Sequence, residues 1–151
     1  MASTGELFRA VVDGVASMVS AAFPDLAVEK TFSPKSKLDG LAVSGPTLYL
    51  LPMAWTDGGP AARGGTVLTL TLGLYTAIPL PPTATWEECW AAQRVAMDVF
   101  DAVRMRRPAG LDRVEWEITN VPIPFDARLV EEAQVMRSGI SVNYKVFYMP
   151  S

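Results

Sequence analysis

The stretch TVLTLTLGLYT, residues 66–76, decides the fold. Its large apolar residues recur at every second position, which is the periodicity of a β-strand, whose successive side chains point to opposite faces. One face carries four leucines, so the pattern predicts that helices bury it. The opposite face is rich in threonine, and we expect it to face water or a neighbouring subunit. The leucines are Leu68, Leu70, Leu72 and Leu74, and the opposite face holds Val67, Thr69, Thr71, Gly73 and Tyr75.

An amphipathic helix is predicted upstream of this strand, over residues 4–22. Its apolar residues recur at three- and four-residue steps, as they do on one face of a helix. Thr4 is the expected N-cap, and Pro24 is the expected stop signal.

A second helix is predicted downstream, from Trp86 to about Met105. The sequence Thr85-x-x-Glu88 at its start is a capping box, in which each residue bonds the backbone of the other. Apolar residues cover a wide arc of this helix. We therefore expect it to pack on the sheet and to contact something else as well.

Shorter extended segments complete the predicted sheet, and a short helix is predicted in the connection before the last strand. From this order we predict an α+β fold in a single domain: a mainly antiparallel sheet of about four to five strands with two main helices packed on one face. The further strands are predicted at 26–33, 46–52, 112–119 and 140–148, the short helix at 127–136, and the domain over 1–151.

Residues 52–65, PMAWTDGGPAARGG, are predicted to form a loop, because four glycines and two prolines disfavour a regular element. We expect this loop to be mobile in a free subunit and to become ordered on contact with a partner; an ordinary solvent-exposed loop is the alternative. Within it, Trp55 is either an interface anchor or a lid that folds back on the core. Arg63 lies in GGPAARGG, which lacks the GxxxxGKS/T spacing of a phosphate-binding loop.

The composition argues against catalysis. The chain has no histidine and one cysteine, which excludes Ser-His-Asp and Cys-His catalysis and His-ligated zinc. That cysteine, Cys89, is expected to be a buried, inert thiol. Glu115 and Glu117 share a strand face without a third ligand. We therefore expect no catalytic residue, no metal, no cofactor and no enzymatic activity.

The charge and hydropathy of the chain limit the kinds of partner that it is expected to bind. The formal net charge is −3, and the basic residues are spread along the chain without the stripe typical of a duplex-binding protein. No stretch approaches the roughly 20 apolar residues that cross a bilayer, so no membrane partner is expected. A single cysteine fits a reducing compartment.

In the order of these elements and in their residue patterns, the sequence resembles the tail terminator proteins of long-tailed bacteriophages. It also resembles related head–tail joining proteins. The resemblance covers nearly the full length, and the family has no catalytic residues to carry over. The segments that carry it are the opening ELFRAVVDGVASMV, the strand TVLTLTLGLYT, the helix TWEECWAAQRVAMDVFDAVR and the ending SGISVNYKVFYMPS.

The resemblance implies a virion protein of the tail or neck, made in the host cytoplasm, that forms a ring, usually hexameric, on the tail tube. Such a ring stops tube growth and joins the tail to the neck of the filled head. Its partners would be copies of itself, the tail tube protein and neck or connector proteins, while genomic DNA passes through without sequence-specific contact. The alternatives are another neck or tail-completion protein of similar fold and a non-viral α/β ligand-binding domain. The residues expected at interfaces are Trp55, Arg63, Val67, Thr69, Thr71, Tyr75 and Trp86.

Overall fold

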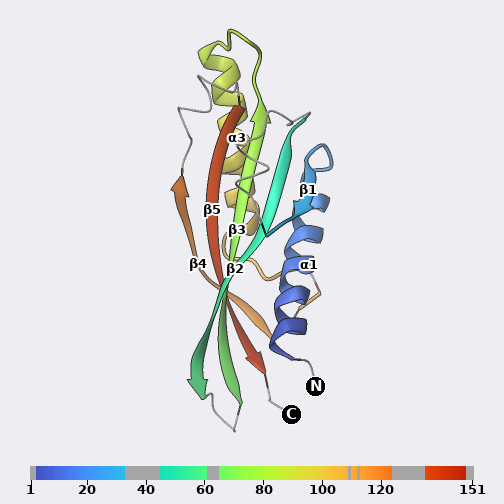
Figure 1. Cartoon of the computed structure of the whole chain (residues 1–151), viewed down its shortest axis with the longest axis vertical. Coiled ribbons are helices and arrows are strands. Elements are labelled where there is room, and N and C mark those ends of the chain that lie inside the picture. Colours follow the sequence, from blue (N-terminus) through green and yellow to red (C-terminus); the bar gives the residue numbers. More distant parts are fainter. Residues whose placement is uncertain are drawn as a thin grey trace.

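The computed structural model of the chain describes residues 3–32, 45–60, 65–108, 110–111, 113–123 and 135–148. In these residues five strands form one sheet in the order β1-β2-β3-β5-β4, and two helices lie against it (Figure 1). This arrangement confirms the predicted α+β fold. The elements are α1 (Thr4–Ala22), β1 (Ala27–Lys30), β2 (Thr47–Pro60), β3 (Thr66–Pro79), α3 (Trp86–Val103), β4 (Val114–Ile123) and β5 (Val135–Tyr148).

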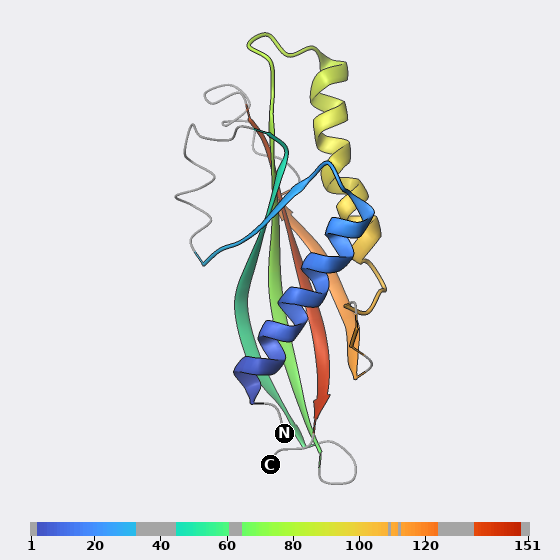
Figure 2. The same ribbon diagram turned by 90° about the vertical axis from the view of Figure 1, so that its right-hand side faces the viewer.

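Strand β3 is the centre of the sheet. It pairs antiparallel with β5 along its whole length, and on its other side it pairs antiparallel with β2 from Thr66 to Ala77. Its four leucines are only 0 to 4% exposed. Helices α1 and α3 both lie on the side of the sheet that these leucines face, and pack with them into one core (Figure 2). The predicted orientation of the strand is therefore confirmed.

Both helices begin with a capping box. In α3 the Thr85 hydroxyl accepts a hydrogen bond from the Glu88 amide, and the Glu88 carboxylate accepts one from the Thr85 amide, as predicted. In α1 the N-cap is Ser3 rather than the predicted Thr4. The reason is that the box needs a glutamate three residues after the cap, and Glu6 stands three residues after Ser3 and bonds its amide.

The predicted loop at 52–65 is wrong for residues 52–60, which belong to β2 and pair with β3. The register of this pairing shifts after Pro52 and again before Pro60. Strand β1 pairs only with residues 47–50 of β2, so residues 51–60 lie at an edge of the described sheet. Proline has no amide hydrogen to donate, and edge strands and bulges tolerate that loss.

Strand β1 pairs with β2 in parallel, so the sheet is mixed although its other pairs are antiparallel. A parallel pair needs a connection that returns the chain to the same end of the sheet. Residues 31–46 are long enough to provide it.

Strand β5 begins at Val135 rather than at the predicted Ile140, because β3 offers it a partner as far as Pro79. Val135 and Met136 therefore belong to a strand and not to the end of the predicted short helix. The remainder of that predicted helix, residues 127–134, lies outside the described residues.

Candidate functional site

The threonine-rich residues predicted at an interface lie together on the side of the sheet away from the helices. Val67, Thr69, Thr71 and Tyr75 alternate with the buried leucines of β3 and are half-buried. We call this side of the sheet the outer face. In the part of the chain that the structure describes, no helix covers it (Figure 2).

The polar groups of the outer face are held in place by neighbouring strands. The Thr71 hydroxyl donates to Asn143 Oδ1 at 2.8 Å, and the Arg137 guanidinium lies 5.7 Å from the centre of the Tyr75 ring. These contacts join β3 to β5. Thr71 and Tyr75 of the outer face are therefore held by side chains of β5.

Trp55 lies in β2 and not in a mobile loop. It pairs with Leu70, and directly opposed residues of an antiparallel pair share a face, so its side chain lies on the helix side of the sheet. The side chain is not a lid on the core, because Trp55 is 65% exposed. Of the two alternatives for Trp55, the lid is therefore wrong, and the role as an interface anchor stays a prediction. The loop expected around Trp55 is a strand instead.

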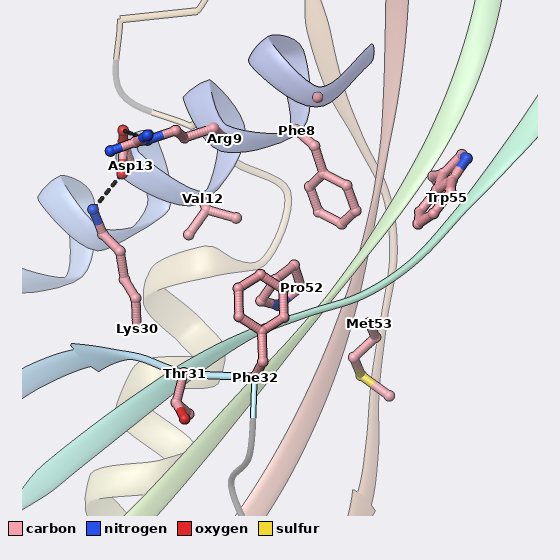
Figure 3. Close-up of a pocket in the computed structure, with 11 residues that line it drawn as sticks. Phe8, Arg9, Val12, Asp13, Lys30, Thr31, Phe32, Pro52, Met53 and Trp55 are labelled. Carbon is pink, nitrogen blue, oxygen red and sulfur yellow. Dashed lines mark hydrogen bonds and ion pairs between the residues drawn. The ribbon is translucent and has the colours of Figure 1, made fainter.

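A groove of about 490 Å³ lies beside Trp55. Figure 3 shows Phe8 and Val12 of α1 pointing toward Pro52 of β2, with Trp55 on the side of Phe8 away from Val12. Phe32, which follows β1, also lines the groove and is 85% exposed. We call this the aromatic groove, since three of its walls carry aromatic rings.

One end of the aromatic groove is charged. Lys30 donates a hydrogen bond to Asp13 Oδ1, and Arg9 Nε lies 4.0 Å from Asp13 Oδ2 (Figure 3). The hydrogen bond from Lys30 is the main cause that lowers the pKa of Asp13 below its usual value of 3.8. Two cations thus share one carboxylate, which leaves this rim with a positive excess.

Trp86 and Trp90 form a second exposed aromatic feature. They stand one turn apart on α3, and their rings stack with centres 5.6 Å apart and planes at 5°. Trp86 is 70% exposed and Trp90 is 44% exposed. We call them the tryptophan pair. Cys89 lies between them in the chain and packs against the core. It is half-buried, whereas the sequence predicts a buried thiol.

The structure thus separates the predicted interface residues into three places. The outer face gathers the residues of β3, whereas Trp55 lies in the aromatic groove and Trp86 begins α3. Arg63 lies outside the described residues. Sequence reasoning missed Phe8 and Phe32 as surface residues; the available signal was an aromatic residue just after a short strand, where no core requires it.

The described residues hold no cluster of metal-ligating side chains. No three of their His, Cys, Asp and Glu side chains gather closely enough to hold a metal ion. Glu117 forms an ion pair with Lys145 at 3.7 Å instead of a carboxylate site with Glu115. Neither helix in the described ranges is long and apolar enough to span a membrane.

No protein-family model matches the sequence, and no curated protein matches it. Among solved structures, a chain from the virion of a native gene transfer agent particle is similar over 99% of this chain and 98% of that chain. The sequence identity is 17% and the TM-score is 0.42. Similarity at this level does not establish a shared fold or function.

Proposed function

We propose that this chain is a structural subunit of a phage-like particle, and specifically a tail terminator that closes into a hexameric ring on the tail tube. The observation that carries the proposal is the pair of unlike apolar surfaces, the concave aromatic groove and the protruding tryptophan pair. Large exposed apolar groups on a small protein mark contacts with other chains. A ring joins each subunit to the next through two different, complementary surfaces, and one copy of this chain carries two such surfaces.

The outer face suits a further contact in such a particle. It is a strand surface of threonine with Val67 and Tyr75, and it lies on the opposite side of the sheet from the aromatic groove. The order of helices and strands also agrees with the resemblance to tail terminators, which rests on the sequence. We assign the remaining contacts of the ring, to the tail tube protein and to neck proteins, to surfaces that include this face.

The charge is consistent with a ring through which DNA passes. The chain has a net charge of −3, and binding to duplex DNA depends on neutralising phosphates with Lys and Arg. A mildly acidic ring lets the genome pass without gripping it. We therefore propose no sequence-specific DNA contact.

The proposal is tested by replacing Trp55 with alanine in the particle-producing strain. Trp55 is 65% exposed, so Trp55→Ala leaves the thermal unfolding of the purified chain nearly unchanged. The same substitution lowers incorporation into particles and yields tails of wrong length or heads without tails. Met105→Ala is the matched control, because Met105 is also exposed, at 70%, but lies outside the aromatic groove and beyond the opposite end of α3 from the tryptophan pair. Normal particles from Trp55→Ala cells count against the terminator role.

A ligand-binding domain is the second candidate, and the aromatic groove favours it. Its volume of about 490 Å³ falls within the range of small-molecule pockets. The two candidates differ in what the groove holds. A monomer at all concentrations that retains a small apolar molecule through purification supports the binding domain, whereas association of the chain with itself or with the tail tube supports the ring.

A further inference from the structure

We propose that the tryptophan pair of one subunit inserts into the aromatic groove of the next subunit, and that this contact repeats around the ring. The inference rests on the proposed function and names the surfaces that close the ring. The two surfaces lie in opposite halves of the molecule along its long axis: α3 begins at one end, and the N-terminal half of α1, which forms the groove wall, lies in the other half (Figures 1 and 2). The pair therefore cannot enter the groove of its own chain, and the occupant is a second copy.

The surfaces match in chemistry. The groove presents apolar and aromatic walls, of which Phe32 and Trp55 remain mostly exposed. The tryptophan pair is a flat, stacked and exposed apolar group of the kind that anchors interfaces in pockets. Inserting it covers the exposed rings of both partners in one contact.

The surfaces also match in charge. Glu87 and Glu88 stand beside Trp86 in the first turn of α3, and both are exposed. At the groove, Arg9 and Lys30 share the single carboxylate of Asp13, so the rim has a positive excess. An acidic helix start that approaches a basic rim is attracted to it, and such complementarity fixes the orientation of a contact.

Strand addition is a less suitable way to join the subunits. The edge of β2 beyond residue 50 carries Pro52 and Pro60, and its ladder is interrupted by two register shifts. Prolines, bulges and charges protect edges against pairing with another chain. Neighbouring copies therefore meet through side chains on this side of the molecule.

The size of the contact predicts a weak interaction between free subunits. A buried aromatic side chain covers roughly 150–250 Å², so the tryptophan pair, 70% and 44% exposed, adds on the order of 200–300 Å² of buried surface on its side. A stable interface needs about 800 Å² on each partner. The contact therefore becomes lasting only in a closed ring on the tube, where every subunit has two neighbours.

Chemical cross-linking in particles tests the inference. In a Cys89→Ala background, one chain receives both Glu87→Cys, beside the tryptophan pair, and Arg9→Cys, at the groove rim. A short bismaleimide then joins thiols that lie close together. The expected result is a ladder of cross-linked chains that ends at the hexamer, while either cysteine alone gives only monomer.

The outcomes separate the two proposals. If the chain is present in particles but the double variant gives no ladder, the inference is wrong and the proposed function stands. A dimer from Glu87→Cys alone means that two tryptophan pairs face each other, and a cross-link within one chain means that the groove is filled internally; both overturn the inference. If the chain is absent from particles, the proposed function itself fails.

Two substitutions sharpen the test. Trp86→Ala removes an exposed anchor and lowers the yield of cross-linked chains by roughly tenfold, as expected for a hot-spot residue. Met105→Ala, at an exposed residue beyond the other end of α3, leaves the yield unchanged. In an otherwise cysteine-free chain assayed by incorporation, Arg9→Glu weakens assembly and Glu87→Arg in the same chain restores it. Failure of this charge exchange to restore assembly contradicts the proposed orientation.

Discussion

Leu72 lies in the middle of the buried leucine face, and it is 0% exposed. It stands between Pro52 on β2 and Val142 on β5, so strands on both sides fix the backbone around it. A cavity left at this point cannot close by a small shift of the chain, because the neighbouring positions are fixed by two ladders. The residue therefore reports how tightly the sheet and helices pack.

We predict that Leu72→Ala lowers the free energy of unfolding by about 2–5 kcal/mol, the range for a buried leucine whose cavity stays open. Thr69→Ala, on the outer face of the same strand, serves as control and changes it by less than about 1 kcal/mol. Denaturant titration of both variants measures the difference. A loss under about 1 kcal/mol for Leu72→Ala would place the leucine face in solvent.

Tyr144 is a buried residue that, unlike Leu72, carries a polar hydroxyl into the core. It is 0% exposed, and its hydroxyl has no hydrogen-bond partner among the described residues. Burial raises the pKa of this phenol, since the charged form is disfavoured in an apolar surrounding. A buried hydroxyl without a partner has lost its hydration without compensation.

Replacing Tyr144 with phenylalanine removes that hydroxyl and keeps the ring in the core. We expect Tyr144→Phe to leave the free energy of unfolding unchanged or to raise it by up to about 1 kcal/mol. Thermal or denaturant unfolding checks the sign. A loss of more than about 1 kcal/mol would mean that the hydroxyl does have a partner in solution.

At the scale of elements, β2 is where the sequence was most misleading. Glycine and proline in residues 52–65 predict a loop, yet β2 continues to Pro60. Residues 52–60 form a strand because they pair with the backbone N–H and C=O groups of β3. Without this second partner strand, those groups of β3 would lack hydrogen bonds. A sequence pattern read locally carries no information about which neighbouring strand is present.

We predict that alternate amides between Ala54 and Asp57 exchange slowly with deuterium in the free subunit, because this segment pairs with Leu68–Thr71. Hydrogen exchange followed by mass spectrometry or NMR measures this protection. Exchange of the whole segment at the rate of an unfolded peptide in the free subunit, with protection only in particles, would restore the loop interpretation.

The Asp13–Lys30 contact ties α1 to β1 at the groove rim. Because the folded pKa of Asp13 lies below its usual value of 3.8, its ionised form stabilises the folded chain. That contribution is fully present above pH 3.8 and is lost as the pH falls through the lower folded pKa. The side chains are substantially exposed, so the effect is small and sensitive to salt.

We therefore expect the wild-type chain to be more stable than Asp13→Asn at pH 6 to 7 in low salt, with the difference vanishing at the acid end. In a Lys30→Gln background, Asp13→Asn has a smaller effect, since the partner is already absent. Unfolding curves over the acid range provide the test. A difference that persists at the lowest pH contradicts the ionic origin of the contribution.

At the scale of the whole molecule, the fold class followed from the sequence because periodicity is a local property. The leucines of β3 and the capping box at Thr85 each indicate their element without reference to the rest of the chain. The parallel pairing of β1 with β2 depends on how distant segments meet, and it was not predicted.

The candidate site could be predicted only in part, for the same physical reason. Trp55 and Trp86 are among the residues expected at interfaces, and both are exposed. The aromatic groove was not predicted, because its walls come from α1, from the end of β1 and from β2. Only the folded chain brings Phe8 and Phe32 to the side of β2 where Trp55 stands.

The ring that we propose consists of copies of this chain closed on one another in a particle. Cryo-electron microscopy of particles, with this chain located in the density, tests it most directly. We predict a single closed ring of six subunits at the head-proximal end of the tail, with the start of α3 of each subunit against the α1 groove of the next. A single copy per particle, an open filament, or particles without this chain would contradict it.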